Sequence, residues 1–193
     1  MKHMALSKYL KQSWAEHPRA VWQERLVQWR KDPATVRVEH PIRLDRARAI
    51  GYKAKPGIIV LRQRIKRGGK MRPQIRAGRR SKHMRRKFIL SKSYQAMAEV
   101  RANRKYPNLE VLNSYYVASD GMHAWYEIVM LDPRSPVISS DPHYSWVANP
   151  ANRRRAFRGL TMAARKSRGL LNKGRGAEKI RPSLRSHGRR GTA

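Results

Sequence analysis

Arginine and lysine are the residues whose number and spacing in this chain could do chemistry, and that chemistry is the binding of phosphate. The 193 residues include 45 Lys and Arg against 12 Asp and Glu, a formal net charge of +33. Residues 46–98 contain 18 Lys and Arg and no acid, and residues 142–193 contain 14 with Glu178 as the single acid. Because such blocks cannot neutralise themselves, they predict a polyanionic partner, most often nucleic acid.

The first cationic block is predicted to form one RNA-contacting arm. Three of its cations alternate along a strand candidate, so they share one face at a spacing of roughly 6.6 Å. A solvated face is the alternative for these three, but the ten Lys and Arg of residues 67–87 favour RNA. The residues assigned to this arm are Arg62, Arg64, Lys66, Arg67, Gly68, Gly69, Lys70, Arg72, Arg76, Arg79, Arg80, Lys82, Arg85 and Arg86, with Lys53 and Lys55 just before it. The glycines permit close approach to phosphate and positive φ.

The second cationic block predicts a second RNA-contacting arm. Its assigned residues are Arg153, Arg154, Arg155, Arg158, Arg165, Lys166, Arg168, Lys173, Arg175, Lys179, Arg181 and Arg185. Arginine is expected to make the bidentate phosphate contacts and the stacking that lysine does not. Most contacts should therefore go to the RNA backbone and its shape, with the base sequence contributing little.

The size of the charge indicates what kind of nucleic acid the partner is. A compact chain of this length has a diameter of roughly 40 Å. Offsetting a charge of +33 along one duplex would take roughly 56 Å of helix axis. Several RNA segments around the protein, as in a large ribonucleoprotein, fit this charge better than a single duplex.

Other chemistries find little support in the sequence. The seven His residues show neither an HExxH pattern nor paired ligand spacing, and there is no cysteine. Gly68-Gly69-Lys70 lacks the spacing of a P-loop and the Ser or Thr that follows its lysine. No Gly-x-Gly-x-x-Gly element follows a strand. We therefore expect no catalytic residue, no metal, no cofactor and no small-molecule substrate.

The elements that would position the cations predict an α+β fold, with a small antiparallel sheet, packed helices and long basic extensions ordered by RNA. Apolar periodicity predicts helices over residues 5–16, 19–31, 44–50 and 90–105, and strands over residues 35–39, 57–66, 109–117 and 125–131. A further short helix over residues 162–168 is predicted by Thr161, which can cap its start, and by Gly169 at its end. Asp120-Gly121 is a turn signal between the last two strands, which predicts a hairpin. Trp22, Leu26 and Trp29 share one helix face and are expected to be core or protein contacts.

Three regions are expected along the chain. Residues 1–50 form an N-terminal helical region packed on the core, residues 51–135 an α+β core with an inserted basic loop at about 67–88, and residues 136–193 a basic extension with a short helix. The loop and the last 25 residues carry too little apolar surface to fold alone. No apolar run approaches the length of a membrane span and no signal-peptide pattern opens the chain, so no membrane contact and a cytoplasmic location are expected.

Three functional classes are compatible with so basic a chain. One is a structural ribonucleoprotein component, the second an RNA-modifying enzyme with a basic docking surface, and the third a nucleoid-packaging protein. Gly-rich basic arms without a nucleophile, cofactor or metal motif favour the first. A packaging protein usually oligomerises through an apolar seam, which the sequence does not display.

Short strings spread over nearly the whole chain carry a family resemblance. They are GYKAKPG (51–57), RGG (67–69), AGRRSK (77–82), NLEVLNSY (108–115), WYEI (125–128), LDP (131–133), FRGLT (157–161) and RKSRGL (165–170). In this order they resemble the large-subunit ribosomal protein fifteen family of archaeal and eukaryotic type, and KIRPSLRS (179–186) is closer to the archaeal branch. The resemblance implies a structural and assembly role without catalysis, with extensions threading through ribosomal RNA of the large subunit. It also implies contacts with neighbouring large-subunit ribosomal proteins.

Overall fold

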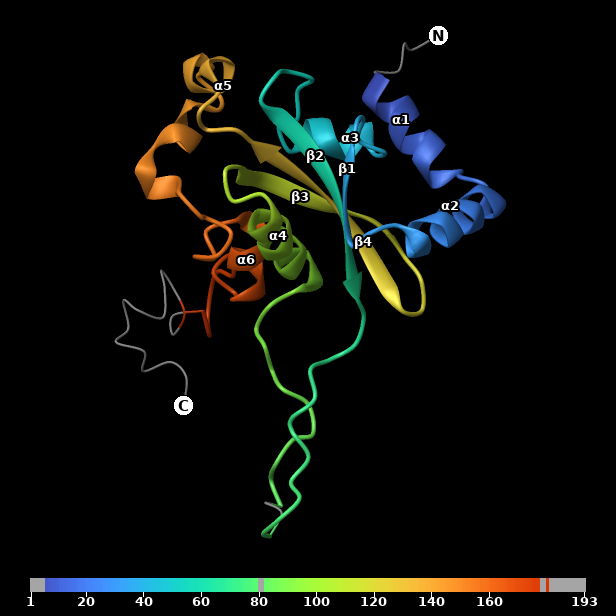
Figure 1. Ribbon diagram of the computed structural model, residues 1–193, viewed down its shortest axis with the longest axis vertical. Helices are drawn as coiled ribbons and strands as arrows, with labels where there is room; N and C mark the ends of the chain where they lie inside the picture. The colour runs from blue at the N-terminus through green and yellow to red at the C-terminus, as the bar shows by residue number, and fades with distance from the viewer. Residues whose placement is uncertain (1–5, 80–81, 178–179, 181–193) are drawn as a thin grey trace.

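A four-stranded antiparallel sheet forms the centre of the fold (Figure 1). The computed structural model describes residues 6–79, 82–177 and 180. The strands are β1 (Thr35–Val38), β2 (Ile58–Lys66), β3 (Glu110–Ser119) and β4 (His123–Leu131), arranged in the order β1-β2-β4-β3. The predicted α+β class and the hairpin, now seen as β3 and β4, are confirmed.

Helices cover both faces of the sheet. They are α1 (Leu6–Ala15), α2 (Arg19–Lys31), α3 (Leu44–Ala49), α4 (Tyr94–Lys105), α5 (Pro136–Ser140) and α6 (Met162–Ser167), with 3₁₀ turns η1 (Ser145–Ala148) and η2 (Pro150–Asn152). Alternate side chains of a strand point to opposite faces. Accordingly, Val60 packs into a cluster with residues of α2 and α3, while Leu61 packs into a second cluster with residues of α4. The neighbouring strand β4 divides its residues in the same way, so it is buried on both faces.

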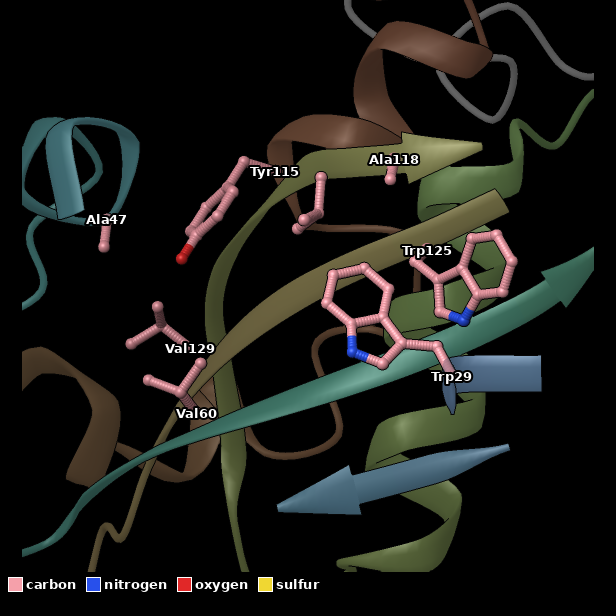
Figure 2. Packing of buried hydrophobic residues seen from close by; sticks show 8 residues of the cluster. Trp29, Ala47, Val60, Tyr115, Ala118, Trp125 and Val129 are labelled. Carbon is pink, nitrogen blue, oxygen red and sulfur yellow. The ribbon is translucent and has the colours of Figure 1, made fainter. Parts of the chain in front are cut away.

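The tryptophan face of α2 belongs to the core. Trp29 is 5% exposed, and its ring centroid lies 6.0 Å from that of Trp125 in β4 (Figure 2). Trp22 lies between Trp29 and Trp14 of α1, at 5.7 and 5.1 Å between ring centroids. This line of rings joins α1 and α2 to the sheet, as expected of a core or protein-contact face.

Two parts of the chain differ from the predicted elements. The helix expected from residue 90 begins at Tyr94, because Ser91 has a left-handed backbone (φ 49°) and the Ser93 side chain caps the helix by accepting from the Ala96 N–H. After β4, α5 and the two 3₁₀ turns were not predicted, because short elements around prolines have no apolar periodicity. They nevertheless bury Ile138, Tyr144 and Val147 in a third apolar cluster.

A long basic arm, residues 67–93, leaves the sheet at the end of β2 and returns at the start of α4 (Figure 1). Its two legs are joined by hydrogen bonds from Arg72 N to Arg86 O (3.0 Å) and from Phe88 N to Lys70 O (2.8 Å). At its base, the N–H and the carbonyl of Gly68 both bond to the Tyr94 hydroxyl, at 2.7 and 3.1 Å. The arm projects away from the body of the protein (Figure 1), and the side chains of residues 67–79 and 82–93 are exposed to solvent.

Candidate nucleic-acid interface

Most acidic side chains of the described residues are buried or half-buried. Among the described residues, the exposed acids are Glu16, Glu24 and Glu39, all in the N-terminal part. From β2 to residue 177 no described acid is exposed, and the surface there carries its charge on Lys and Arg. This region therefore offers an anion many exposed cations and no fully exposed carboxylate.

Glu127 of β4 is one of the buried acids, and its hydrogen bonds fix the segment before α3. Its side chain is fully buried and accepts hydrogen bonds from the Tyr115 hydroxyl and from the Ile42 N–H, at 3.1 to 3.2 Å in the latter case. Burial raises the pKa of the Glu127 carboxyl, and these hydrogen bonds oppose the rise. The carboxylate thus fixes the N-terminal region to the hairpin from inside the protein.

Glu99 of α4 plays the same part for the C-terminal region. It is fully buried and accepts from the hydroxyls of Ser114 and Thr161, both at 2.5 Å. Burial raises the pKa of the Glu99 carboxyl. Thr161 also caps α6 by accepting from the Ala164 N–H, as its place before the helix predicted. One carboxylate therefore ties α4, β3 and α6 together.

Glu110 anchors the start of the second cationic block through the main chain. Its carboxylate accepts from the backbone N–H of Arg154 (2.7 Å) and from that of Arg155 (3.3 Å). Arg154 has a left-handed backbone, φ 52°. A residue with a Cβ in that conformation costs about 1–3 kcal/mol. The buried carboxylate holds this strained turn in place.

Four of the predicted RNA-binding cations are half-buried and bonded within the protein. Arg62 pairs with Asp32 and lies over the Trp29 ring, 4.4 Å from its centroid, and burial lowers its pKa. Arg64 donates to the carbonyls of Trp29 and Arg30. The strand face that carries these two arginines is covered by the end of α2, so it is not the open cationic face that the alternation predicted. Their role in RNA binding stays a prediction, and these contacts argue against it.

The other two half-buried cations are Lys55 and Arg155. Lys55 pairs with the buried Asp141 at 2.6 Å, and this bond lowers the pKa of Asp141. Arg155 donates to the carbonyls of Val111 (2.6 Å) and Leu112 (3.0 Å). Both side chains are therefore occupied in joining the C-terminal half of the protein to its core.

The remaining described cations of the predicted set are exposed. They are Lys53, Lys66, Arg67, Lys70, Arg72, Arg76, Arg79, Lys82, Arg85, Arg86, Arg153, Arg154, Arg158, Arg165, Lys166, Arg168, Lys173 and Arg175, and Gly68 and Gly69 are exposed beside them. Arg80, Lys179, Arg181 and Arg185 lie outside the described residues. The structure thus groups the exposed cations on the arm and on the surface around α6.

Sequence reasoning missed an aromatic residue on the arm. Phe88 is 40% exposed, and the charged groups of Lys70 and Arg72 lie 5.6 and 5.0 Å from its ring centroid. The three meet because the legs of the arm pair Met71 with Lys87. The register of the two legs was not visible in the sequence. The one signal that the sequence offered for this contact was an aromatic residue next to a cationic run. An exposed ring between cations is a surface on which a base can stack.

Comparison with known proteins identifies the family. A family model described as ribosomal L15, of the L15e type, matches residues 4–187. The chain belongs to the ribosomal L15e family. Among its L15e relatives is the large ribosomal subunit protein eL15 of Methanocella arvoryzae, which is 50% identical over 188 residues, 95% of this chain and 96% of the relative. The protein of the same name from Picrophilus torridus is 51% identical over 170 residues, 88% of this chain and 87% of the relative.

The predicted resemblance is confirmed, and both of these L15e relatives are archaeal. The match takes in the sheet, the basic arm and most of the second cationic block. Within the described part of this L15e chain, no three His, Asp or Glu side chains gather where a metal ion could be held. The helices described in residues 6–79, 82–177 and 180 include none long and apolar enough to span a membrane.

Proposed function

We propose that this chain is a structural constituent of the large ribosomal subunit that binds and stabilises folded ribosomal RNA. Its family membership and the names of its relatives support this role. The observation that carries the proposal is the separation of charge by sign. From β2 to residue 177, every described acid is buried or half-buried, while 17 of the cations assigned to RNA binding are exposed.

The arm serves as an RNA-penetrating extension. Its legs carry Arg72 and Arg76 on one side and Arg85 and Arg86 on the other, all exposed. A narrow element of this kind exposes cations in several directions, so it can enter a crevice between RNA segments and contact phosphates on each side. Release of the counterions from those phosphates favours binding.

The surface around α6 supplies the second attachment. Arg165 and Lys166 lie in the last turn of the helix and Arg168 caps its C-terminal end. All three are exposed, and Glu99 fixes the helix to α4 from beneath through Thr161. A fixed cationic surface beside a projecting arm would hold two RNA segments at a set distance, which is a structural and not a catalytic task.

Neighbouring ribosomal proteins are the second class of partner in this proposal. The exposed acids Glu16 and Glu24 lie in the turn after α1 and in α2, and Leu6, Tyr9 and Val27 of these two helices also present apolar surface. This mixture suits a protein contact better than an RNA contact. The protein acts in cytoplasmic ribosomes, with no membrane contact and no catalysis, cofactor or small-molecule substrate of its own.

Co-sedimentation tests the proposal. We expect the protein to sediment with the large subunit through sucrose after a moderate salt wash and to dissociate as salt rises. An RNA-modifying enzyme with a basic docking surface would instead turn over on deproteinised ribosomal RNA. Release from the subunit at low salt, or turnover by the isolated protein, would contradict the proposed role.

A further inference from the structure

We propose that a hollow between α4 and residues 153–157 receives one unstacked nucleobase of the RNA, a base that carries an exocyclic amino group. The inference rests on the proposed function and names a specific contact within it. The hollow measures about 330 Å³ and is lined by Asn103, Arg104, Pro107, Arg154 and Phe157. That volume is at the lower end of the roughly 300–1,000 Å³ usual for small-ligand sites.

An aromatic wall gives the hollow affinity for a flat ring. Phe157 is 43% exposed, although the preceding residue, Ala156, is buried in the core. An exposed aromatic fixed to a buried neighbour presents a rigid face on which a base can stack. Pro107 supplies a second apolar surface.

The rim of the hollow is cationic. Arg104 and Arg154 are exposed and form no ion pair with any described acid. A second hollow of about 300 Å³ shares Pro107 and is lined also by Arg134, Arg153 and Glu110. The Glu110 carboxylate is buried and already accepts from the backbone N–H groups of Arg154 and Arg155. An RNA strand that crosses Pro107 would therefore have two arginines for its phosphates on each side. The same rim would repel a lysine or arginine side chain of a neighbouring protein, so a nucleotide fits better than a peptide.

Asn103 gives the hollow a preference among bases. Its side chain is buried, 1% exposed, and Nδ2 donates to the carbonyls of Leu109 (2.6 Å) and Tyr106 (3.4 Å). These bonds fix the amide orientation and leave Oδ1 buried without a hydrogen-bond partner among the described residues. Unpaired buried acceptors are rare in folded proteins and call for a donor. Since Asn103 lines the hollow, an exocyclic amino group of adenine, cytosine or guanine would be such a donor. Uracil lacks an exocyclic amino group, and its one base donor is the ring N3–H.

The backbone conformation of Arg154 also supports a binding site at this hollow. Arg154 is one of two described residues other than glycine with positive φ, and Glu110 holds its N–H. Strained backbone that the surrounding structure fixes in this way is concentrated at binding and catalytic sites. Here it sets the direction in which the Arg154 side chain leaves the rim.

Binding of short RNA probes to the full chain tests the inference. The probes are ten-nucleotide oligouridylates with one central adenosine or, in its place, purine riboside, which stacks similarly but lacks the amino group. Fluorescence anisotropy at fixed salt should show the adenosine probe bound several-fold more tightly. Phe157→Ala should weaken that probe by about 5- to 150-fold, the range for loss of one stacked base, and should abolish the difference between probes.

Leu160→Ala is the matched control, since Leu160 is 40% exposed in the same segment and does not line the hollow. It should leave both probes unchanged, and circular dichroism should show all variants folded. The inference is overturned if the two variants lose equal amounts of RNA affinity, or if the wild type binds both probes equally well. Either result would make a protein side chain the better occupant of the hollow. Sedimentation with the large subunit tests the proposed function separately. If the protein sediments with the subunit but shows no discrimination between the probes, only the base site is refuted.

Discussion

Tyr115 and Glu127 lie directly opposite each other in the register of β3 and β4, and the Tyr115 hydroxyl donates to the Glu127 carboxylate in the core. Burial and the neighbouring carboxylate raise the pKa of the Tyr115 hydroxyl, so it remains a donor. The pair places a charge-bearing group at the centre of the sheet. Its effect on stability follows from how completely the carboxylate is satisfied.

Tyr115→Phe should destabilise the protein by about 1–3 kcal/mol, because it leaves a buried acceptor without one of its donors. Tyr116→Phe is the matched control, since Tyr116 is 46% exposed and bonds only to the Ser119 hydroxyl. That change should stay within about 0.5 kcal/mol. Urea unfolding followed by circular dichroism measures both, and equal effects would show that the buried bond contributes nothing special.

The pH dependence of stability should reveal the buried Glu99. Its pKa is raised by burial from the ordinary value of 4.5, so the folded state holds the proton more tightly than the unfolded state. This group therefore favours folding most when it is protonated, below about pH 4.5, and its contribution falls as pH rises through the folded-state pKa. Glu99→Gln removes the titration, so the variant should lose less stability than the wild type over that window. A Glu24→Gln variant, changed at an exposed site, should keep the wild-type slope.

Salt dependence should separate the arm from the rest of the surface. If the protein neutralises roughly six to ten phosphates, its RNA affinity should fall by about 10³ to 10⁵ between 50 and 200 mM salt. Changing Arg76 and Arg85 to Gln should reduce the slope of log K against log salt by about 1.5 to 2. The same change at Arg19 and Arg37, exposed cations in the N-terminal part, should leave it nearly constant. Equal slopes for the two double variants would remove the arm from the interface.

Arg62→Gln should affect stability and not RNA binding. The guanidinium pairs with Asp32 and lies over Trp29, so its loss should cost about 1–3 kcal/mol. Because the side chain is half-buried beneath α2, the salt slope of RNA binding should not change. A drop of about one in the slope, with stability intact, would restore Arg62 to the RNA interface.

Much of the fold was predictable because its signals are local. The helix over residues 19–31 and the strand ending at Lys66 follow from apolar periodicity, and both match the structure. α5 was missed because a helix of five residues that begins at a proline shows no apolar periodicity. The confirmed cap at Thr161 needed only a threonine in front of a helical run.

The candidate site was less predictable, because its pairings join distant parts of the chain. Charge blocks indicated which segments are cationic, but Arg62 meets Asp32 thirty residues earlier and Lys55 meets Asp141 eighty-six residues later. The inward placement of the acids likewise depends on tertiary packing. Asn103 has no sequence signal at all, since an unpaired oxygen can be recognised only after every neighbour has been placed.

The Glu110 carboxylate accepts hydrogen bonds from the backbone N–H groups of Arg154 and Arg155 and makes no ion pair with either guanidinium. The anchor therefore uses main-chain groups that every residue except proline possesses, and it leaves the Arg154 side chain free at the surface. Mutation can then exchange that side chain while the segment stays fastened. The scaffold and the exposed side chain can therefore change separately, because different atoms of the same residue serve each.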